Sequence, residues 1–431
     1  MLTNIRTMPY KKTKLQNGLR VITVPVKNAN SVTVLILVGT GSKYETKDIN
    51  GISHFLEHMF FKGTKKRPNT LAISETLDRI GGQYNAFTSK EVTGFWAKVD
   101  KKHTDVALDW ISDIFLNSKF EKEELEREKG VVVEELNMYL DTPTSYVSEL
   151  FEDLLYGDQP AGWRIVGEKE TIMNFNREKL LDYYHNNYSN ENTVVCVAGS
   201  IDAKEFEGKI KKYFSRIELR KHSKKPITKE AQSKPGVLIH YKKTDQTHFC
   251  LGVRAYDMYD PRRYTLSLMA VILGGNMSSR LFISVRERNG LGYYVHTSVD
   301  ATTDTGYLVT QTGIKNDSLE KAIMLILKEY KDLKNNKITE QELKKAKDYV
   351  RGTMSLSLDA TDSQASFYAS QEVMGEKVLT PEEKLKMIDK VSVNDIKEVA
   401  EDIFLNGKLN LSVIGPFEEK EKKNLEKILK I

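Results

Sequence analysis

The stretch LRVITVPVKNANSVTVLILVG, from Leu19 to Gly39, predicts two buried strands. Both runs are rich in β-branched residues, and the four residues KNAN between them are typical of a hairpin connection. The second run, from Val32, is apolar but far too short to span a bilayer, so it indicates a strand inside a protein core. We therefore expect a sheet that includes these two runs as paired neighbours.

The same order of elements returns in the second half of the sequence. The first half closes with the strand-like run NTVVCVAGS (192–200), and a basic, polar stretch with two prolines follows at 216–236. The strand pair then recurs as GVLIHYKK (236–243) and HFCLGVRAY (248–256), and KLNLSVIGP (408–416) mirrors the closing strand. This repetition predicts an α+β fold of two homologous domains, each an antiparallel sheet packed with helices.

The predicted boundaries are 1–217 for the first domain, 218–235 for a linker and 236–431 for the second domain. The interleaved lysines and glutamates, with a formal net charge of +5, indicate solvated helix faces and not a nucleic-acid surface. Cys196 and Cys250 lie in apolar runs without a metal or disulfide spacing, which fits a reducing compartment. The N-terminal residues lack the apolar segment of a secretory signal, so we expect a cytoplasmic protein without a membrane partner.

The stretch GISHFLEHMFFKGT carries two histidines and a glutamate on one predicted helix. His54 and His58 are four residues apart and project from the same face, where two imidazoles can share a Zn²⁺ ion. Glu57 borders that face and can accept a proton without being a ligand, which is the H-x-x-E-H arrangement of inverzincins. The alternative is an ordinary core helix built around Phe55 and Leu56.

A catalytic zinc ion usually has three protein ligands, so a further ligand is expected elsewhere in the chain. The predicted helix LEREKGVVVEELNMYLD offers four carboxylates: Glu126, Glu128, Glu134 and Glu135. Glu128 and Glu135 share one face with Val131, which we expect to turn toward the core, whereas Glu134 is rotated by about 100°. Buried carboxylates are costly unless a metal or its histidines compensate them. A solvated charged face is the alternative, but beside the histidine motif we favour Glu135 as ligand and Glu128 as a supporting acid.

Four separated motifs now point to one family. They are HFLEHMFFKGT (His54–Thr64), GGQYNAFTSKEVTGFWAKV (Gly81–Val99), EREKGVVVEEL (Glu126–Leu136) and GGNMSSRLFISVRERNGLGYYV (Gly274–Val295). In this order they make essentially the whole chain resemble the pitrilysin/insulinase family of zinc endopeptidases. The resemblance implies a metal helix, a substrate-binding edge strand and a helix that supplies Glu135 as third ligand. It also implies that the chain is one half of a dimeric clamshell, as in the mitochondrial processing peptidase and its bacterial homologues.

The resemblance assigns further roles. An arginine and a tyrosine seven residues apart contact the bound peptide in this family, and the matching pair here is Arg286 and Tyr293. A peptide is expected to add as a strand along NAFT. We expect this peptide to make main-chain contacts with Asn85 and Ala86. We expect its side chains to enter pockets lined by Phe61 and Phe87.

The function that follows is a zinc endopeptidase with one Zn²⁺ per chain, held by His54, His58 and Glu135, and with Glu57 as general base. Short or unstructured peptides are the expected substrates, inside the chamber of a homodimer in which Arg286 and Tyr293 come from the partner. One alternative is a catalytically silent subunit that binds peptides or assists assembly, and the other is one chain of a heterodimer whose partner supplies part of the binding surface. LGGNMSSRLF stands where the non-catalytic processing subunit has a glycine-rich loop, which favours the catalytic type.

Overall fold

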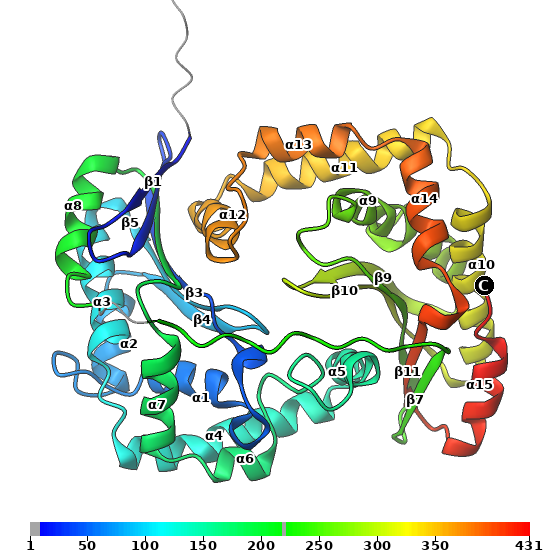
Figure 1. Ribbon diagram of the computed structural model, residues 1–431, viewed down its shortest axis with the longest axis horizontal. Coiled ribbons are helices and arrows are strands. Elements are labelled where there is room, and N and C mark those ends of the chain that lie inside the picture. Colours follow the sequence, from blue (N-terminus) through cyan, green and yellow to red (C-terminus); the bar gives the residue numbers. More distant parts are fainter. Residues whose placement is uncertain (1–8, 218–220) are drawn as a thin grey trace, which may run out of the picture. The chain divides into compact units, whose positions relative to one another are not determined.

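The computed structural model describes residues 9–217 and 221–431, which form two compact units (Figure 1). Unit 1 contains the described residues of Met1–Leu136, Arg164–Pro226 and Met354–Thr380, and unit 2 contains Asn137–Trp163, Ile227–Thr353 and Pro381–Ile431. Each unit has one mixed sheet with helices on its faces, so the predicted α+β fold of two domains is confirmed. The expectation that each sheet is antiparallel is wrong in one strand pair per unit, because β2 (Arg20–Pro25) is parallel to β6 (Thr193–Gly199) and β7 (Gly236–Tyr241) is parallel to β11 (Leu409–Gly415). In the described ranges, no helix is long and apolar enough to cross a membrane.

The sheet of unit 1 has the strand order β1-β2-β6-β3-β5-β4. Its strands are β1 (Lys11–Lys14), β2 (Arg20–Pro25), β3 (Ser31–Val38), β4 (Gln83–Thr88), β5 (Thr93–Asp100) and β6 (Thr193–Gly199). The predicted strands β2 and β3 form, but the predicted hairpin between them is wrong. Strand β6 lies between them, parallel to β2 and antiparallel to β3, with Cys196 opposite Ile22 on one side and Leu35 on the other. Every residue of β6 is buried, which explains its central position.

Helices cover both faces of this sheet. They are α1 (Ile52–Met59), α2 (Thr70–Asp78), α3 (Thr104–Asn117), α4 (Lys122–Asp141, in unit 1 as far as Leu136), α6 (Lys169–Met173), α7 (Arg177–Asn187), α8 (Ala203–Tyr213) and α12 (Thr361–Val373). In Figure 1 α3 and α8 lie on one side of the strands, and α12 packs on the other. The apolar rings of Phe60, Phe95 and Phe115 meet on the α3 side, so α1 is fixed to the same layer.

The sheet of unit 2 repeats the arrangement in the order β7-β11-β8-β10-β9. Its strands are β7 (Gly236–Tyr241), β8 (Gln246–Ala255), β9 (Gly292–Ala301), β10 (Gly306–Lys315) and β11 (Leu409–Gly415). Its helices are α5 (Pro143–Tyr156), α9 (Arg263–Gly274), α10 (Leu319–Asn335), α11 (Glu340–Ser357, in unit 2 as far as Thr353), α13 (Pro381–Asp389), α14 (Val393–Ile403) and α15 (Lys422–Ile428). The late strand β11 enters between β7 and β8 just as β6 enters between β2 and β3.

The two halves of the sequence exchange one helix each. Helix α5 comes from the first half, but its apolar face, including Val147 and Phe151, packs on the sheet of unit 2. Helix α12 comes from the second half, and Ala365 and Tyr368 pack on the sheet of unit 1. The continuous boundaries 1–217 and 236–431 describe the sheets but not these helices, because each helix follows its apolar face and not chain order. Of the predicted linker, 221–235 contains no helix or strand, and 218–220 lie outside the described residues.

Candidate metal centre

A buried carboxylate fixes the start of the histidine helix α1. Glu45 accepts hydrogen bonds from the backbone N–H groups of Gly51 and Ser53, both at 2.8 Å, and from Asn50 Nδ2 at 3.0 Å. Gly51 has a φ of +96°, and a Cβ at this position would lie 2.4 Å from Val166 O. Burial raises the pKa of Glu45, and these hydrogen bonds oppose that rise. The first turn of α1 is therefore held at a defined point.

The apolar side of α1 sets the rotation of the helix. Phe55, Leu56 and Met59 are fully buried, and Phe60 stacks edge-on against Phe95 with ring centroids 4.7 Å apart. This packing turns the opposite side of the helix, with its two histidines, toward α4. Local packing thus accounts for the direction of the polar side chains.

His54, His58 and Glu135 meet at this side. His54 Nε2 lies 3.6 Å from Glu135 Oε1, and His58 Nε2 lies 3.3 Å from Glu135 Oε2. One ligand atom from each residue falls within 4.8 Å of the other two, and within 9–217 and 221–431 no other such trio of His, Cys, Asp and Glu occurs. Ligand atoms about 2.1 Å from a tetrahedral zinc ion lie roughly 3.4 Å apart, so the three residues fit this ion.

Glu128 contacts His58 through the ring nitrogen that does not face Glu135. His58 Nδ1 lies 2.8 Å from Glu128 Oε1, and Lys62 Nζ lies 2.5 Å from Glu128 Oε2. Carboxylates in this position fix the orientation of a ligand histidine. The expectation that Val131 faces the core is wrong, because its side chain is 52% exposed although it shares the face of the two glutamates. Glu134 is exposed and lies outside the group of three.

The carboxylates around His54 and His58 favour the binding of a positive charge between them. His54 and His58 beside Glu135 hold the pKa of its carboxyl well below the usual range. Burial alone would lower the pKa of His58, but hydrogen bonds and charge from Glu128 and Glu135 raise it to about 9. Burial tends to raise the pKa of Glu128, yet His58 and Lys62 bring it below its ordinary value. The carboxylates thus stabilise a positive charge here, either a proton on His58 or a metal ion.

Glu57 lies beside this group and is not part of it. Its carboxylate is partly buried and accepts a hydrogen bond from Thr88 Oγ1 at 2.5 Å. Burial raises the pKa of Glu57, while Thr88 and the charges of His54 and His58 lower it in part. His54, His58 and Glu135 are called the metal group below. A carboxylate with a raised pKa beside such a group is suited to proton transfer.

The predicted peptide-binding residues follow one edge of the sheet. Asn85, Ala86 and Phe87 belong to β4, which pairs with β5 and has no strand on its other side among the described residues. Phe87 is 42% exposed, and Phe61 is partly buried with its ring 6.1 Å from Trp110. The strand thus presents an open edge beside α1, where an extended peptide could add.

Arg286 and Tyr293 come together within unit 2. Arg286 belongs to a π-helical turn, Phe282–Glu287, and Tyr293 lies at the start of β9. The Arg286 guanidinium carbon lies 4.7 Å from the centre of the Phe282 ring and 5.1 Å from that of Tyr293, which is 78% exposed. Two aromatic rings therefore hold the guanidinium at the surface of this unit.

Sequence reasoning missed three residues that support the group. Lys62 stands four residues after His58, so on a helix expected to run as far as Gly63 its spacing is a signal that could have been used, although α1 ends at Met59. Thr88 and Glu45 carry no such signal, because their contacts depend on how β4 and the loop before α1 pack.

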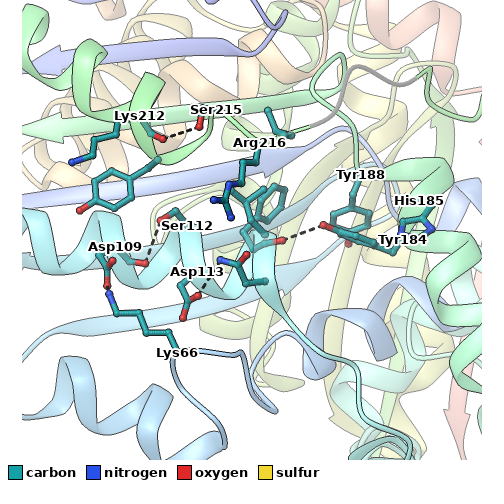
Figure 2. Close-up of a pocket in the computed structure, with 15 residues that line it drawn as sticks. Lys66, Asp109, Ser112, Asp113, Tyr184, His185, Tyr188, Lys212, Ser215 and Arg216 are labelled. Carbon is teal, nitrogen blue, oxygen red and sulfur yellow. Dashed lines mark hydrogen bonds and ion pairs between the residues drawn. The ribbon is translucent and has the colours of Figure 1, made fainter.

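Unit 1 also contains a cavity of about 560 Å³ in the region of α3, α7 and α8 (Figure 2). Its lining includes Asp109 and Asp113, and none of His54, His58 and Glu135 contributes to it. Lys66 and Arg67 pair with Asp109, and Arg67 also pairs with Asp113. Its two acids are already compensated, so the cavity offers no second acidic site.

Known proteins resemble this chain over most of its length. Residues 20–169 match the family described as Insulinase (Peptidase family M16), and residues 174–350 match the Peptidase M16 inactive domain. An uncharacterized zinc protease of Bacillus subtilis, YmxG, is 37% identical over 406 residues, which are 94% of this chain and 98% of that protein. An uncharacterized zinc protease of Mycobacterium leprae is 32% identical, with 95% and 92% covered.

Solved structures share the fold. A protease from Helicobacter pylori has a TM-score of 0.88 at 23% identity, covering 94% of this chain and 99% of that chain. A peptidase M16 inactive domain from Pseudomonas fluorescens has a TM-score of 0.87 at 17% identity, covering 95% and 98%. At these identities the similarity establishes the architecture alone.

Proposed function

The chain belongs to the M16 (insulinase) peptidase family, and from this premise we propose that it is a zinc-dependent endopeptidase. The observation that carries the proposal is the convergence of His54, His58 and Glu135 with Glu57 beside them. The match to an inactive domain covers 174–350, and all four of these residues lie outside it. The part of the chain that would perform the chemistry therefore belongs to the other match.

His54, His58 and Glu135 would hold Zn²⁺, which when bound supplies a Lewis acid that lowers the pKa of water and polarises the scissile carbonyl. Glu57 takes the proton of the attacking water and passes it to the leaving amine. Glu128 holds His58 in position through the Nδ1 hydrogen bond, and Lys62 compensates the charge of Glu128. The residues that would hold the metal are thus distinct from Glu57, which transfers the proton.

The open edge of β4 would take the peptide as an added strand. Backbone groups of Asn85 and Ala86 pair with the peptide, and Phe61 and Phe87 contact its side chains. Main-chain pairing selects an extended conformation more than a sequence, so short or unstructured peptides are the substrates that suit this edge.

We further propose that two copies of the chain form a closed chamber with two complete sites. Each site combines the metal group of one copy with Arg286 and Tyr293 of the other. Tyr293 helps to stabilise the developing oxyanion, and Arg286 contacts the peptide backbone. Mixing Glu57→Gln chains with Arg286→Ala chains should then restore part of the activity, because one of the two sites in the mixed dimer is intact. Absence of rescue in confirmed mixed dimers would contradict shared sites.

Metal analysis coupled to hydrolysis tests the main proposal. The purified protein should contain about one zinc per chain, and it should cleave a mixed library of unstructured peptides in a chelator-sensitive way. Glu57→Gln should keep the zinc and lose most of the turnover. A protein that binds zinc but cleaves no peptide would be a silent peptide-binding subunit, whereas activity only with a second, different chain would indicate a heterodimer.

A further inference from the structure

We propose that Thr88 is a positioning residue that orients the general base Glu57 and ties it to the strand that receives the peptide. This inference rests on the proposed function. Thr88 contributes no atom to the metal group, and it acts through the carboxylate that it contacts.

The contact has the geometry of a strong hydrogen bond. Thr88 Oγ1 donates to Glu57 Oε2 at 2.5 Å, within the range of hydroxyl donors on ionised carboxylates. Within 9–217 and 221–431 it is the one hydrogen bond described for this carboxylate, and Glu57 Oε1 has none. The hydroxyl thus occupies one oxygen and leaves the other available to accept a proton.

Thr88 is a rigidly placed donor. It is the last residue of β4, in the partly buried row with Tyr84 and Ala86, and it stands opposite Thr93 on β5. The turn that follows is closed by hydrogen bonds between Ser89 and Val92, at 2.8 to 3.1 Å. The backbone that carries the Thr88 hydroxyl is therefore held in place by the hairpin. The Glu57 side chain has three rotatable bonds, so it depends more on this hydrogen bond for its orientation.

The strand opposite is anchored as well. Thr93 Oγ1 donates to Thr40 O at 3.0 Å in a buried position, which ties the hairpin to the segment that follows β3. Thr93 thus has the same side chain as Thr88 and faces it across the strand pair, but its hydroxyl is bound to a backbone carbonyl. It provides a matched control for the loss of a hydroxyl from this hairpin.

Without the Thr88 hydroxyl, Glu57 can leave its orientation beside His54 and His58. A displacement of about 1 Å at a catalytic group can cost on the order of 100-fold in rate. Peptide binding depends on the backbone edge of β4, which a side-chain change on the inward row leaves in place. Zinc binding depends on His54, His58 and Glu135 and not on Thr88. The inference therefore predicts that loss of the Thr88 hydroxyl lowers turnover but leaves peptide binding and zinc binding unchanged.

Kinetics of Thr88→Val, Thr88→Ser and Thr93→Val test this separation. Thr88→Val should lower kcat by about 10- to 100-fold, with KM and zinc content near those of the wild type. Thr88→Ser keeps the hydroxyl and should restore most of kcat, and Thr93→Val should keep kcat even if it lowers the melting temperature. Wild-type kcat in Thr88→Val, no rescue by serine, or an equal loss in Thr93→Val would each overturn the inference.

Crystal structures give a readout that needs no activity. The wild type should show Glu57 in one conformer on Thr88, and Thr88→Val should show a different or divided conformer with the zinc ligands unchanged. An unmoved Glu57 in Thr88→Val would overturn the inference. A wild-type protein without zinc-dependent hydrolysis would instead overturn the proposed function, and the Glu57 conformers would still decide whether Thr88 positions this carboxylate.

Discussion

Replacing Glu128 by glutamine should weaken zinc binding although Glu128 is not a proposed ligand. The buried carboxylate uses one oxygen for His58 Nδ1 at 2.8 Å and the other for Lys62 Nζ at 2.5 Å. A glutamine side chain has one acceptor oxygen and a donating NH₂ group, so it can satisfy His58 or Lys62 but not both. Either His58 loses the partner that orients its ring, or the Lys62 ammonium is left partly buried without its counter-charge.

The magnitude follows from the position of this contact. Removing the group that orients a ligand histidine typically costs about 10- to 100-fold in metal affinity, which is about 1.4 to 2.7 kcal/mol. We expect the higher part of this range, because Glu128 is 4% exposed and water does not readily replace it. Glu134→Gln is the matched control: it removes the same charge from the same helix at an exposed position, and it should change the affinity by less than about twofold.

Competition with a chromophoric chelator measures the two affinities on metal-free protein. Circular dichroism and melting temperature should show that both variants are folded. If Glu128→Gln binds zinc as tightly as the wild type, or if Glu134→Gln loses as much as Glu128→Gln, the role assigned to Glu128 is refuted.

Three further predictions concern the same helix pair. Glu135→Ala should weaken zinc binding by more than the ~100-fold upper value for Glu128, whereas Glu134→Ala should bind normally; the reverse result would exchange the two assignments. Zinc needs a neutral imidazole, and the pKa of His58 is raised to about 9 in the metal-free protein. Apparent affinity should therefore rise about tenfold per pH unit up to pH 9 and level off above it, and a flat titration by competition would contradict the proton displacement. Glu45→Gln should reduce the free energy of unfolding by about 1–3 kcal/mol in urea denaturation, because one of the two backbone N–H groups that it binds loses its acceptor; unchanged stability would show that the carboxylate does not secure α1.

Local periodicity is enough to predict part of the site. Helical spacing places His54 and His58 on one face, and the interval of seven residues places Glu128 and Glu135 on one face of the next helix. The same reasoning failed for Val131, because a shared face does not determine which neighbour covers each residue. The contact of Thr88 with Glu57 was beyond reach, since it needs the distance between a strand and a helix that meet only in the folded unit.

The fold shows the same division between local and distant information. The runs that form β2 and β3 were evident from their composition, but their separation depends on β6, which lies more than 150 residues farther along the chain. A short connection is a strong hairpin signal only when no distant strand competes for the same edge. In this chain the fully buried β6 takes that place.

Because α5 and α12 are exchanged, neither half of the polypeptide can complete its own hydrophobic core. Synthesis of the first half leaves the sheet made by β2, β6 and β3 without Ala365 and Tyr368, which are made about 150 residues later. Two fragments produced by a break in 221–235 should each expose an uncovered sheet and precipitate alone, yet assemble when they are expressed together. The hydrophobic core of unit 1 can therefore be completed only after α12 (Thr361–Val373) has been synthesised.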